Sequence, residues 1–439
     1  MFNKLKDKIK YFRQHRFVQQ TAILQTGNVV GNFIQAIIGV FLARLLQPHL
    51  FGIYSIAISL GSLAALFIGT GIFSAAAPLV GESYAKKDYD TLRDILGFLV
   101  KMIILTGILG LVYIAILPWI GSHFYGSSSI GVYAGLAVIA LLFASTSSSF
   151  ILLCLQLVGK IKTMAKFMVA DQILRYGSSL VLVFLGLGAV GAVNGQWIGA
   201  AIIALISAIY WKKLRREYNI FPSFKKLTSL SLSVPLKRYF GFTFWVTLDR
   251  NMGNFYMTLP VVLTAAYVSA SEVTYFKLAF GYMNLAMSLL GPISTLLNME
   301  FSRMKADNEQ SLARNFVKVS LYSLILSAIL TAGVIIVAPF AFKILYGMSF
   351  LPSVKYVTGL FVYGALFGVG VGLGPMWRTV DRVKTSILIN TIILGAGIPT
   401  GIMLIKSFGL WGAVIMVTTW FTVSHLVSFL YLSRKLRHL

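Results

Sequence analysis

Residues Phe242–Val262, FTFWVTLDRNMGNFYMTLPVV, form an apolar stretch that is long enough to cross a lipid bilayer as one helix. The stretch carries Asp249, Arg250, Asn251 and Asn254 near its middle. At a rise of about 1.5 Å per residue, Arg250 would lie roughly 15 Å from the helix end, close to the bilayer midplane. A charge at that depth costs about 3 kcal/mol or more unless it faces a bundle interior or a wet cavity. The stretch therefore predicts a bundle of membrane helices with a polar interior.

The composition of the whole chain supports a membrane protein. Of the 439 residues, 57% are hydrophobic and only 12% are charged, whereas soluble domains average about 25% charged residues. The net charge of +25 does not indicate a nucleic-acid partner, because the basic residues lie in short loops between apolar stretches. An anionic inner lipid leaflet is the expected partner of these loops. The single cysteine, Cys154, leaves no disulfide framework or CxxC metal site, and we expect no cofactor.

Twelve apolar stretches follow one another along the chain. Most Lys and Arg residues lie in the N-terminal arm, the even-numbered loops and the C-terminal tail. Positive charge marks the cytoplasmic side, so the pattern predicts an all-α polytopic protein of the cell (inner or plasma) membrane with both termini in the cytoplasm. The stretches lie near residues 20–43, 52–78, 96–120, 132–156, 165–186, 189–211, 239–264, 274–298, 317–342, 355–377, 385–405 and 409–432.

The loops divide the chain into five regions. Residues 1–19 place apolar side chains at helical spacing among lysines and predict a retained amphipathic arm on the cytoplasmic leaflet. Residues 20–211 are expected to form an N-lobe of six helices, and residues 239–432 a C-lobe of six. The basic segment 212–238, with two prolines, is the predicted cytoplasmic linker, and residues 433–439 are a cytoplasmic tail.

Sequence features of the first predicted lobe recur in the second at a constant distance along the chain. This repeat offset is the one that aligns Thr21 with Thr243. Polar residues spaced four, three and four apart occupy one face of the first helix, and the same spacing recurs on the seventh. Six helices per lobe give both lobes the same orientation, so we expect a parallel repeat around a central cavity lined by both polar stripes. Asp249 lies off the stripe. The stripes are Thr21, Gln25, Asn28 and Asn32 in the first lobe and Thr243, Thr247, Arg250 and Asn254 in the second.

Other charges also fall within predicted spans. Asp171 and Arg175 are four residues apart and can pair within one helix. The pair can be structural or can bind substrate, and the residues alone favour neither. The asparagines of the stripes can likewise serve as hydrogen bonds between helices rather than as ligand contacts. Four basic residues near helix ends are expected to extend to the lipid head groups, namely Arg44, Lys101, Lys277 and Arg378.

Motifs of common enzymes are missing from the sequence. No GxxxxGK[ST], HExxH or GxSxG sequence is present, and the outer loops are too short for a nucleophile, a base and an orienting residue. We therefore expect a transporter rather than an enzyme, with H⁺ or Na⁺ as coupling ion if transport is active. The loop GESYAKKDYD (81–90) lacks the GxxxD[RK]xG[RK] pattern of major-facilitator transporters, which counts against that twelve-helix family.

Two segments of the sequence, Leu42–Leu60 and Thr247–Ala279, carry a family likeness. They resemble the polysaccharide exporters, or Wzx-type flippases, of the multidrug/oligosaccharidyl-lipid/polysaccharide (MOP) superfamily. Leu42–Leu60, LARLLQPHLFGIYSIAISL, has that family's arginine, proline-containing outer turn and glycine–aromatic pair. Thr247–Ala279, TLDRNMGNFYMTLPVVLTAAYVSASEVTYFKLA, is similar to the start of the family's second half. The sequence departs from the family in having Val273-Thr274 where a glycine usually precedes the tyrosine.

This resemblance implies a MATE-like fold and a transport function. The expected substrate is a polyprenyl-diphosphate-linked oligosaccharide of the O-antigen or lipopolysaccharide kind, moved to the outer leaflet by alternating access alongside glycan-assembly proteins. Arg44, Asp249 and Arg250 are the residues that match the family's pattern, and cavity arginines suit a diphosphate. A multidrug or toxin cation antiporter on the same fold is the alternative. The two Asp and two Arg deep in the spans favour an anionic or zwitterionic substrate.

Overall fold

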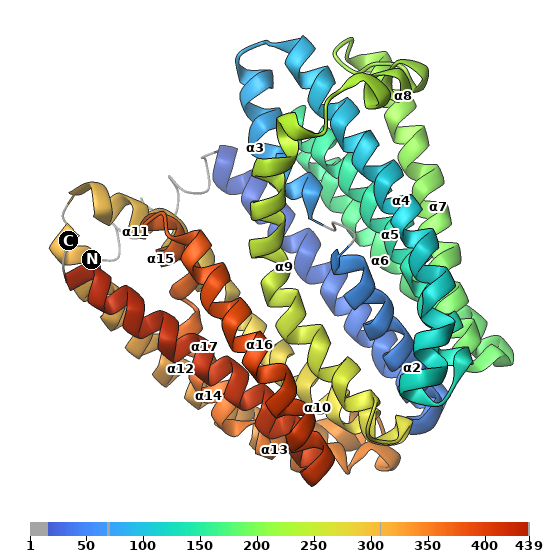
Figure 1. Cartoon of the computed structure of the whole chain (residues 1–439), viewed down its shortest axis with the longest axis vertical. Helices are drawn as coiled ribbons and strands as arrows, with labels where there is room; N and C mark the ends of the chain where they lie inside the picture. Colours follow the sequence, from blue (N-terminus) through green and yellow to red (C-terminus); the bar gives the residue numbers. More distant parts are fainter. Residues whose placement is uncertain (1–15, 68–70, 308, 438–439) are drawn as a thin grey trace. The chain divides into compact units, whose positions relative to one another are not determined.

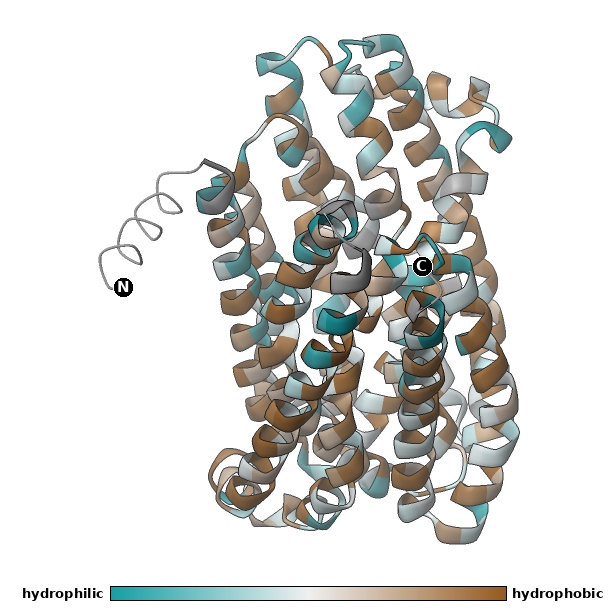
Figure 2. Cartoon of the chain, turned by 90° about the vertical axis from the view of Figure 1, so that its left-hand side faces the viewer, coloured by the Kyte–Doolittle hydropathy of each residue, from teal (hydrophilic) through white to brown (hydrophobic). Residues whose placement is uncertain are grey.

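The computed structural model describes residues 16–67, 71–307 and 309–437, and every regular element among them is a helix (Figure 1). Most of the length of the helices consists of hydrophobic residues (Figure 2). The predicted arm 1–19 falls mainly on residues outside the described ranges. The long apolar stretches form helices because a backbone in lipid must satisfy its own hydrogen bonds.

The first half of the chain contains six of the predicted spans. The first helix, α2, bends at Gln47, whose φ of 56° and ψ of 171° are not helical and which precedes Pro48. This break separates the first two predicted spans, as expected for the proline-containing turn. The elements are α2 (Arg16–Phe67), α3 (Ile72–Ala85), α4 (Tyr89–Tyr125), α5 (Ser128–Leu157), α6 (Ile161–Leu182), the π-helix η1 (Val183–Leu187) and α7 (Gly188–Glu217).

The second half begins with a short helix that the sequence did not predict, α8 (Phe224–Ser233), within the segment 212–238. The tenth predicted span consists of three short helices rather than one. The predicted tail 433–439 continues the last helix as far as Arg437. The remaining elements are α9 (Lys237–Ala265), α10 (Ala270–Met287), η2 (Ser288–Leu290), α11 (Gly291–Asp307), α12 (Glu309–Leu345), η3 (Met348–Phe350), α13 (Ser353–Gly359), α14 (Phe361–Gly370), α15 (Leu373–Thr379), α16 (Val383–Phe408) and α17 (Leu410–Arg437).

Many of these helices are suited to cross a membrane. In the described chain, eight helical stretches are long and apolar enough, or nine if the pair Ser353–Gly359 and Phe361–Thr379, bent by 49°, is one span. Of the eight, Ile161–Glu217 contains two predicted spans, and Gln19–Leu66 contains the first predicted span and more than half of the second, 52–78, whose end lies in α3. Helix α9 is not among the eight, in keeping with its polar middle. The predicted multi-pass, all-α membrane fold is confirmed.

The chain divides into two compact units. The first comprises the described residues up to Leu45 together with Ala64–Ser122 and Ser128–Thr247. The second comprises Leu46–Leu63, His123–Ser127 and the chain from Leu248 onward. The division thus falls inside α9, whereas the predicted linker 212–238, including α8, belongs to the first unit.

The internal repeat is visible in the backbone of the two halves. The offset that aligns Thr21 with Thr243 also aligns the start of α6 with that of α16, and the start of α7 with that of α17. Residues with positive φ, where the chain turns sharply, recur at the same offset or one position short of it. These turn residues are Gly126 and Gly347 (φ 63° and 98°), Gly159 and Asp381 (71° and 52°), and Gly188 and Gly409 (54° and 57°).

Glycines on α7 let it pack directly against the backbone of α6. A Cβ atom on Gly195 would lie 2.2 Å from the Cα of Ser179, and one on Gly199 would lie 2.4 Å from the Cα of Arg175. The Ser179 hydroxyl donates to the carbonyl of Ala192 at 2.7 Å. Small residues at such positions allow close helix contact in membranes, and this contact holds the charged segment of α6 in place.

We expect Gly199→Ala to destabilise the protein by about 1–3 kcal/mol, because its new methyl group would meet backbone atoms that cannot move aside. The matched control is Gly177→Ala on α6, where a Cβ meets nothing within 4 Å. That control should keep or gain stability, since alanine favours a helix over glycine by about 1 kcal/mol. Thermal unfolding of the purified variants in detergent measures the difference. Equal melting temperatures for both variants would show that the α6–α7 contact is looser than described.

Candidate functional site

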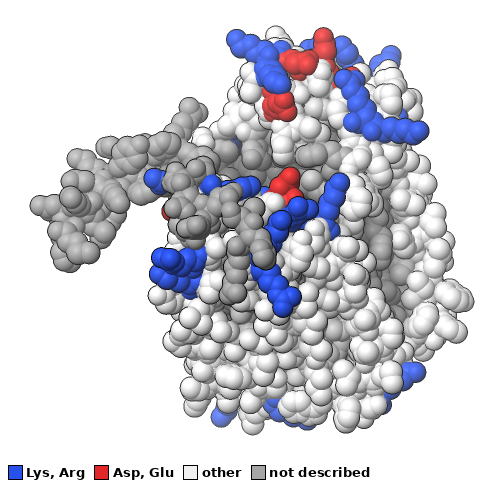
Figure 3. Space-filling view, turned by 60° about the vertical axis from the view of Figure 1, so that its left-hand side comes forward, with Lys and Arg blue, Asp and Glu red and all other residues white. Residues whose placement is uncertain are grey.

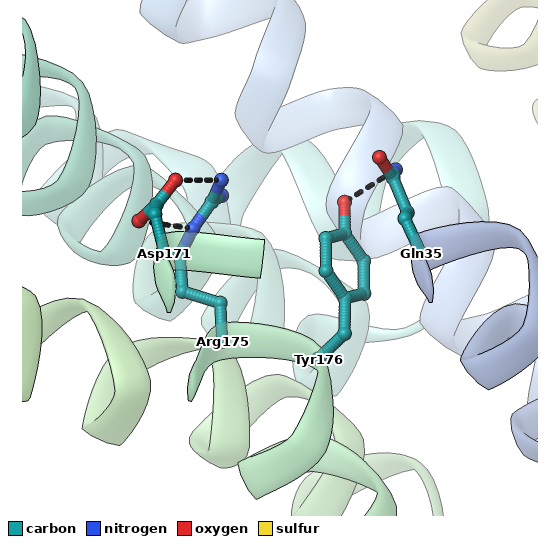
Figure 4. A network of polar contacts seen from close by, with 4 residues as sticks. All are labelled: Gln35, Asp171, Arg175 and Tyr176. Atoms are coloured by element: carbon teal, nitrogen blue, oxygen red, sulfur yellow. Dashed lines mark hydrogen bonds and ion pairs between the residues drawn. The ribbon is translucent and has the colours of Figure 1, made fainter. Parts of the chain in front are cut away.

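A largely buried ion pair lies on α6 within the first unit (Figure 4). Arg175 donates from Nε to Asp171 Oδ1 at 3.0 Å and from Nη2 to Oδ2 at 2.7 Å. Both side chains are only 13% exposed. The predicted pairing within one helix is confirmed, and its bidentate geometry is the strongest form of a charge-assisted hydrogen bond.

Two neutral residues extend this site to a second helix, α2. The Arg175 guanidinium carbon lies 5.7 Å from the centre of the Tyr176 ring. Gln35 on α2 donates from Nε2 to the Tyr176 hydroxyl at 2.6 Å (Figure 4). The sequence analysis missed both residues. Gln35 could have been found, because it lies three residues after Asn32 and continues the polar stripe of that helix.

The second repeat has no such charge pair. At the repeat offset, Asp171 and Arg175 correspond to Ile393 and Gly397 on α16. The corresponding helices of that repeat are joined by neutral groups: Tyr256 on α9 donates to the carbonyl oxygen of Asn390 at 3.4 Å. The fold therefore forms this helix contact without charges, which leaves the pair of the first repeat available for a function.

The polar stripe of α2 lies on an open face of the helix. Gln25, Asn28 and Asn32 are all exposed. The adjoining face, about 100° away around the helix axis, carries Gly27 and Gly31 and packs on α6. A Cβ on Gly27 would lie 3.0 Å from the Cβ of Ala165, and one on Gly31 would lie 3.2 Å from the Cγ of Gln172. The glycines thus decide which side of α2 is buried, and the amides stay accessible to a ligand.

The residues of the predicted polar stripe of α9 differ in how far they are buried. Thr247 is buried, and its hydroxyl has no hydrogen-bond partner in the described part of the chain. Asn254 is exposed and Asp249 is half-buried. The buried face instead includes Asn251, which is 4% exposed and lies one turn after Thr247. The side chain of Arg250 lies outside the described part of the structure.

Arg44, which the family resemblance singled out, is exposed and lies one turn before the break at Gln47. The structure therefore brings together Asp171 and Arg175, adds Gln35 and Tyr176 to them, and places Arg44 at the end of the first span of α2.

Lys277 on α10 was expected to reach the head groups, and this expectation is wrong. Its Nζ donates instead to the carbonyl of Ser55 at 3.3 Å and to the hydroxyl of Ser59 at 3.4 Å, both on the second span of α2. No carboxylate lies within ion-pair distance of this ammonium group among the described residues. An ammonium group held inside a membrane bundle without a counterion is a candidate for function.

The contact of Lys277 joins equivalent positions of the two repeats, because the repeat offset aligns Ser55 with Lys277. Two neighbouring contacts are equivalent to each other, because the same offset aligns Pro48 with Ala270 and Gly52 with Thr274. The Thr274 hydroxyl donates to the carbonyl of Pro48 at 2.7 Å. A Cβ on Gly52 would lie 1.9 Å from the carbonyl oxygen of Ala270. All these residues belong to the second unit, so the two spans pack as an isologous pair centred near Lys277.

The other basic residues expected at head groups also have protein partners. Lys101 on α4 donates to the carbonyl of Val234 at 2.6 Å, just past the end of α8. Arg378 on α15 is exposed and donates to Asn298 Oδ1 on α11 at 3.2 Å. Within the described ranges, no group of three or more His, Cys, Asp or Glu residues is placed to hold a metal ion.

Several solved structures of membrane transporters have a fold similar to that of this chain. An inward-facing multidrug resistance MATE family transporter of the MOP superfamily matches 92% of this chain and 94% of its own, with a TM-score of 0.67 and 17% identity. The lipid II flippase MurJ in an inward closed conformation matches 94% of this chain and 91% of its own, with a TM-score of 0.67 and 15% identity. A eukaryotic MATE transporter, AtDTX14, covers 96% and 98%, with a TM-score of 0.64 and 18% identity.

The fold is therefore that of the MOP superfamily transporters. No curated protein sequence matches the chain significantly. The profile of one family matches residues 17–298, more than half of the chain. That family is described as polysaccharide biosynthesis protein, and this chain belongs to it.

Proposed function

We propose that this protein is a flippase that moves a polyprenyl-diphosphate-linked oligosaccharide, or a related glycan lipid, from the cytoplasmic to the outer leaflet of the cell membrane. The family match over residues 17–298 carries the proposal. The fold shared with a lipid II flippase supports it. Both termini lie in the cytoplasm in this proposal, as the loop charges predict. Alternating access, coupled to H⁺ or Na⁺, moves the substrate, and glycan-assembly proteins supply it.

The chemistry of the proposed substrate assigns roles to the polar residues. A diphosphate needs cations that can form paired hydrogen bonds, and guanidinium groups meet this need. Sugar hydroxyls need amide and hydroxyl partners. The arginines proposed to bind the diphosphate are Arg44, Arg175 and Arg250. Asp171 orients Arg175, and Asp249 is proposed as a further contact of the substrate. The side chains proposed to contact sugars are Gln25, Asn28, Asn32, Thr247 and Asn254.

Deletion of the gene tests the proposed function. A lipid-linked glycan should then accumulate in the inner leaflet, and mass spectrometry of extracted lipids would identify both its sugars and its carrier. Re-expression of the full chain should remove the accumulated lipid. An unchanged pool of lipid-linked glycans after deletion would overturn the proposal.

A cation antiporter is the second candidate, and the fold of the MATE transporters favours it. A site for cationic drugs would require carboxylates without matching cations nearby. The described pair of Asp171 with Arg175 leaves that carboxylate already neutralised. Unchanged glycans together with increased sensitivity to cationic drugs in the deletion strain would establish the antiporter instead.

Arg250→Ala should lower glycan export by roughly tenfold to a hundredfold, the effect of losing one or two hydrogen bonds to a charged group. The variant should still insert and accumulate, because alanine suits a membrane helix. Surface glycan per inserted protein measures the change. The control is Arg434→Ala, which removes an exposed arginine near the end of α17. Normal export by Arg250→Ala would remove Arg250 from the proposed site.

A further inference from the structure

A cavity of about 230 Å³ lies within the first unit, between α4, α5, α7 and α8. Its walls are almost entirely apolar. Val100 and Ile103 come from α4, Phe150 and Ile151 from α5, and Leu227 from α8. The cavity is therefore suited to a hydrocarbon chain rather than to a sugar or an ion.

Two of the three hydroxyl-bearing residues at the cavity wall, Ser207 and Thr228, do not change this apolar character. Ser207 donates to the carbonyl of Ile203 at 2.8 Å, and Thr228 donates to the carbonyl of Phe224 at 3.0 Å. Both hydroxyl groups are thus satisfied by their own helices. Trp211 is different: its indole is 2% exposed and its Nε1 has no acceptor among the described residues. An occupant with an ester or phosphate oxygen would offer such an acceptor.

Helix α8 covers one side of the cavity and is firmly anchored. Ser223 caps its first turn by accepting a hydrogen bond from the backbone of Lys226 at 3.2 Å. Lys101 of α4 donates to two carbonyls at the C-terminal end of α8, that of Leu232 in the last turn at 3.3 Å and that of Val234 just past it at 2.6 Å. These bonds satisfy groups that a helix end leaves open. The segment predicted as a linker thus contains an anchored helix that forms one wall of the cavity.

The exposed side chains of α8 are both apolar and basic. Phe224 is 56% exposed and Leu232 is 76% exposed, as expected for a helix that lies in a membrane interface. Lys225 and Lys226 are exposed and lie in the sequence between the cavity residues Phe224 and Leu227.

Further basic residues lie at the end of the first unit that contains α8. Lys and Arg side chains gather at the end of the first unit where α8 lies (Figures 1 and 3). Lys212 and Lys213 follow Trp211 directly and are exposed. The acidic side chains at this end are largely engaged: Glu217 pairs with Lys160, whose hydrogen bond lowers the pKa of that carboxyl, and Asp94 pairs with Arg238 at 2.9 Å.

We propose that this cavity binds an anionic membrane phospholipid, with one acyl chain between α4, α5 and α7 and the phosphate group over the lysines of α8. An apolar cavity with basic residues at its rim is the arrangement that binds acidic lipid head groups between membrane helices. This lipid is a bound component of the first unit and is distinct from the glycan lipid that the protein is proposed to move. Its binding does not depend on the proposed function.

Native mass spectrometry of the full chain in detergent tests the site, with equal amounts of phosphatidylglycerol and phosphatidylcholine that carry the same acyl chains. The wild-type protein should retain phosphatidylglycerol preferentially. Lys225→Ser with Lys226→Ser should weaken that binding roughly 30-fold, since each lysine beside an anionic head group contributes a factor of about five. Lys162→Ser with Lys166→Ser, which removes two exposed lysines of α6, should change nothing.

A second pair of variants tests the cavity itself. Ala204→Leu would fill the space, because Ala204 lines it, and should abolish retention of the lipid. Ala201→Leu is the matched control, since Ala201 lies one turn earlier on α7, is also half-buried and does not line the cavity. Three results would overturn the proposal: equal retention of both phospholipids, unchanged binding by Ala204→Leu, or stronger retention of an added polyprenyl phosphate than of phosphatidylglycerol.

Discussion

Asp171→Leu should destabilise the protein by about 3–5 kcal/mol, because it leaves the guanidinium group of Arg175 with no counterion in a largely buried position. The carboxylate and the guanidinium now share two hydrogen bonds, at 3.0 and 2.7 Å. Arg175→Met should have a similar effect for the opposite charge. Thermal unfolding in detergent and the amount of protein in the membrane fraction measure the loss.

The double variant Asp171→Asn with Arg175→Gln separates stability from function. It removes both charges and keeps two side chains that can hydrogen-bond to each other, so stability should return to within about 1 kcal/mol of the wild type. The second repeat supports this expectation, because it holds Ile393 and Gly397 at the corresponding positions. Glycan export by the double variant should nevertheless stay low if Arg175 binds the diphosphate.

A surface pair serves as the control. Arg93 and Asp90 are joined at 3.1 Å on α4, but the Asp90 side chain is 96% exposed. Asp90→Asn with Arg93→Gln should change stability by less than about 1 kcal/mol, as for most exposed ion pairs. If the double variant at Asp171 and Arg175 regained both stability and export, the pair would be purely structural, and Arg175 would leave the proposed site.

The sequence predicts this fold well because its strongest signals are local. Each apolar stretch is mainly helical over its described residues, and the repeat offset reappears in the starts of α6 and α16 and in the paired turns. The pairing of Asp171 with Arg175 can also be predicted from the sequence, because residues four apart on a helix lie next to each other.

The features that were missed depend on contacts between distant segments. Gly27 and Gly31, rather than the amides, determine the packed side of α2, and only the structure shows that Ala165 and Gln172 of α6 lie opposite them. Helix α8 has ten residues and buries little more than Leu227 and Ser231, so its apolar pattern is too short to be recognised as a helix. Its C-terminal end is also held by Lys101 of α4, a contact with a distant segment that no local pattern shows.

Lys277→Met should leave the melting temperature unchanged or raise it, while glycan export falls by roughly tenfold to a hundredfold. Methionine has a similar length and suits an apolar bundle, so the variant removes the cost of keeping an ammonium group away from water. The hydrogen bonds to Ser55 and Ser59, at 3.3 and 3.4 Å, are long and offset little of that cost. A charge that weakens the fold at this position is expected to have another use, and binding of an anionic group or a transported proton would provide it.

The position of Lys277 strengthens this argument. Lys277 contacts Ser55, the residue at the equivalent position of the first repeat. The two repeats therefore meet at this point with a single charge, that of the lysine in the second repeat. Lys406→Met, which removes an exposed lysine near the end of α16, is the control and should export normally. If Lys277→Met instead lowered the melting temperature and exported normally per folded molecule, the ammonium group would serve only to join α10 to α2. Retained export in Lys277→Arg, together with its loss in Lys277→Met, would show that the charge itself is required, because only the first substitution keeps it.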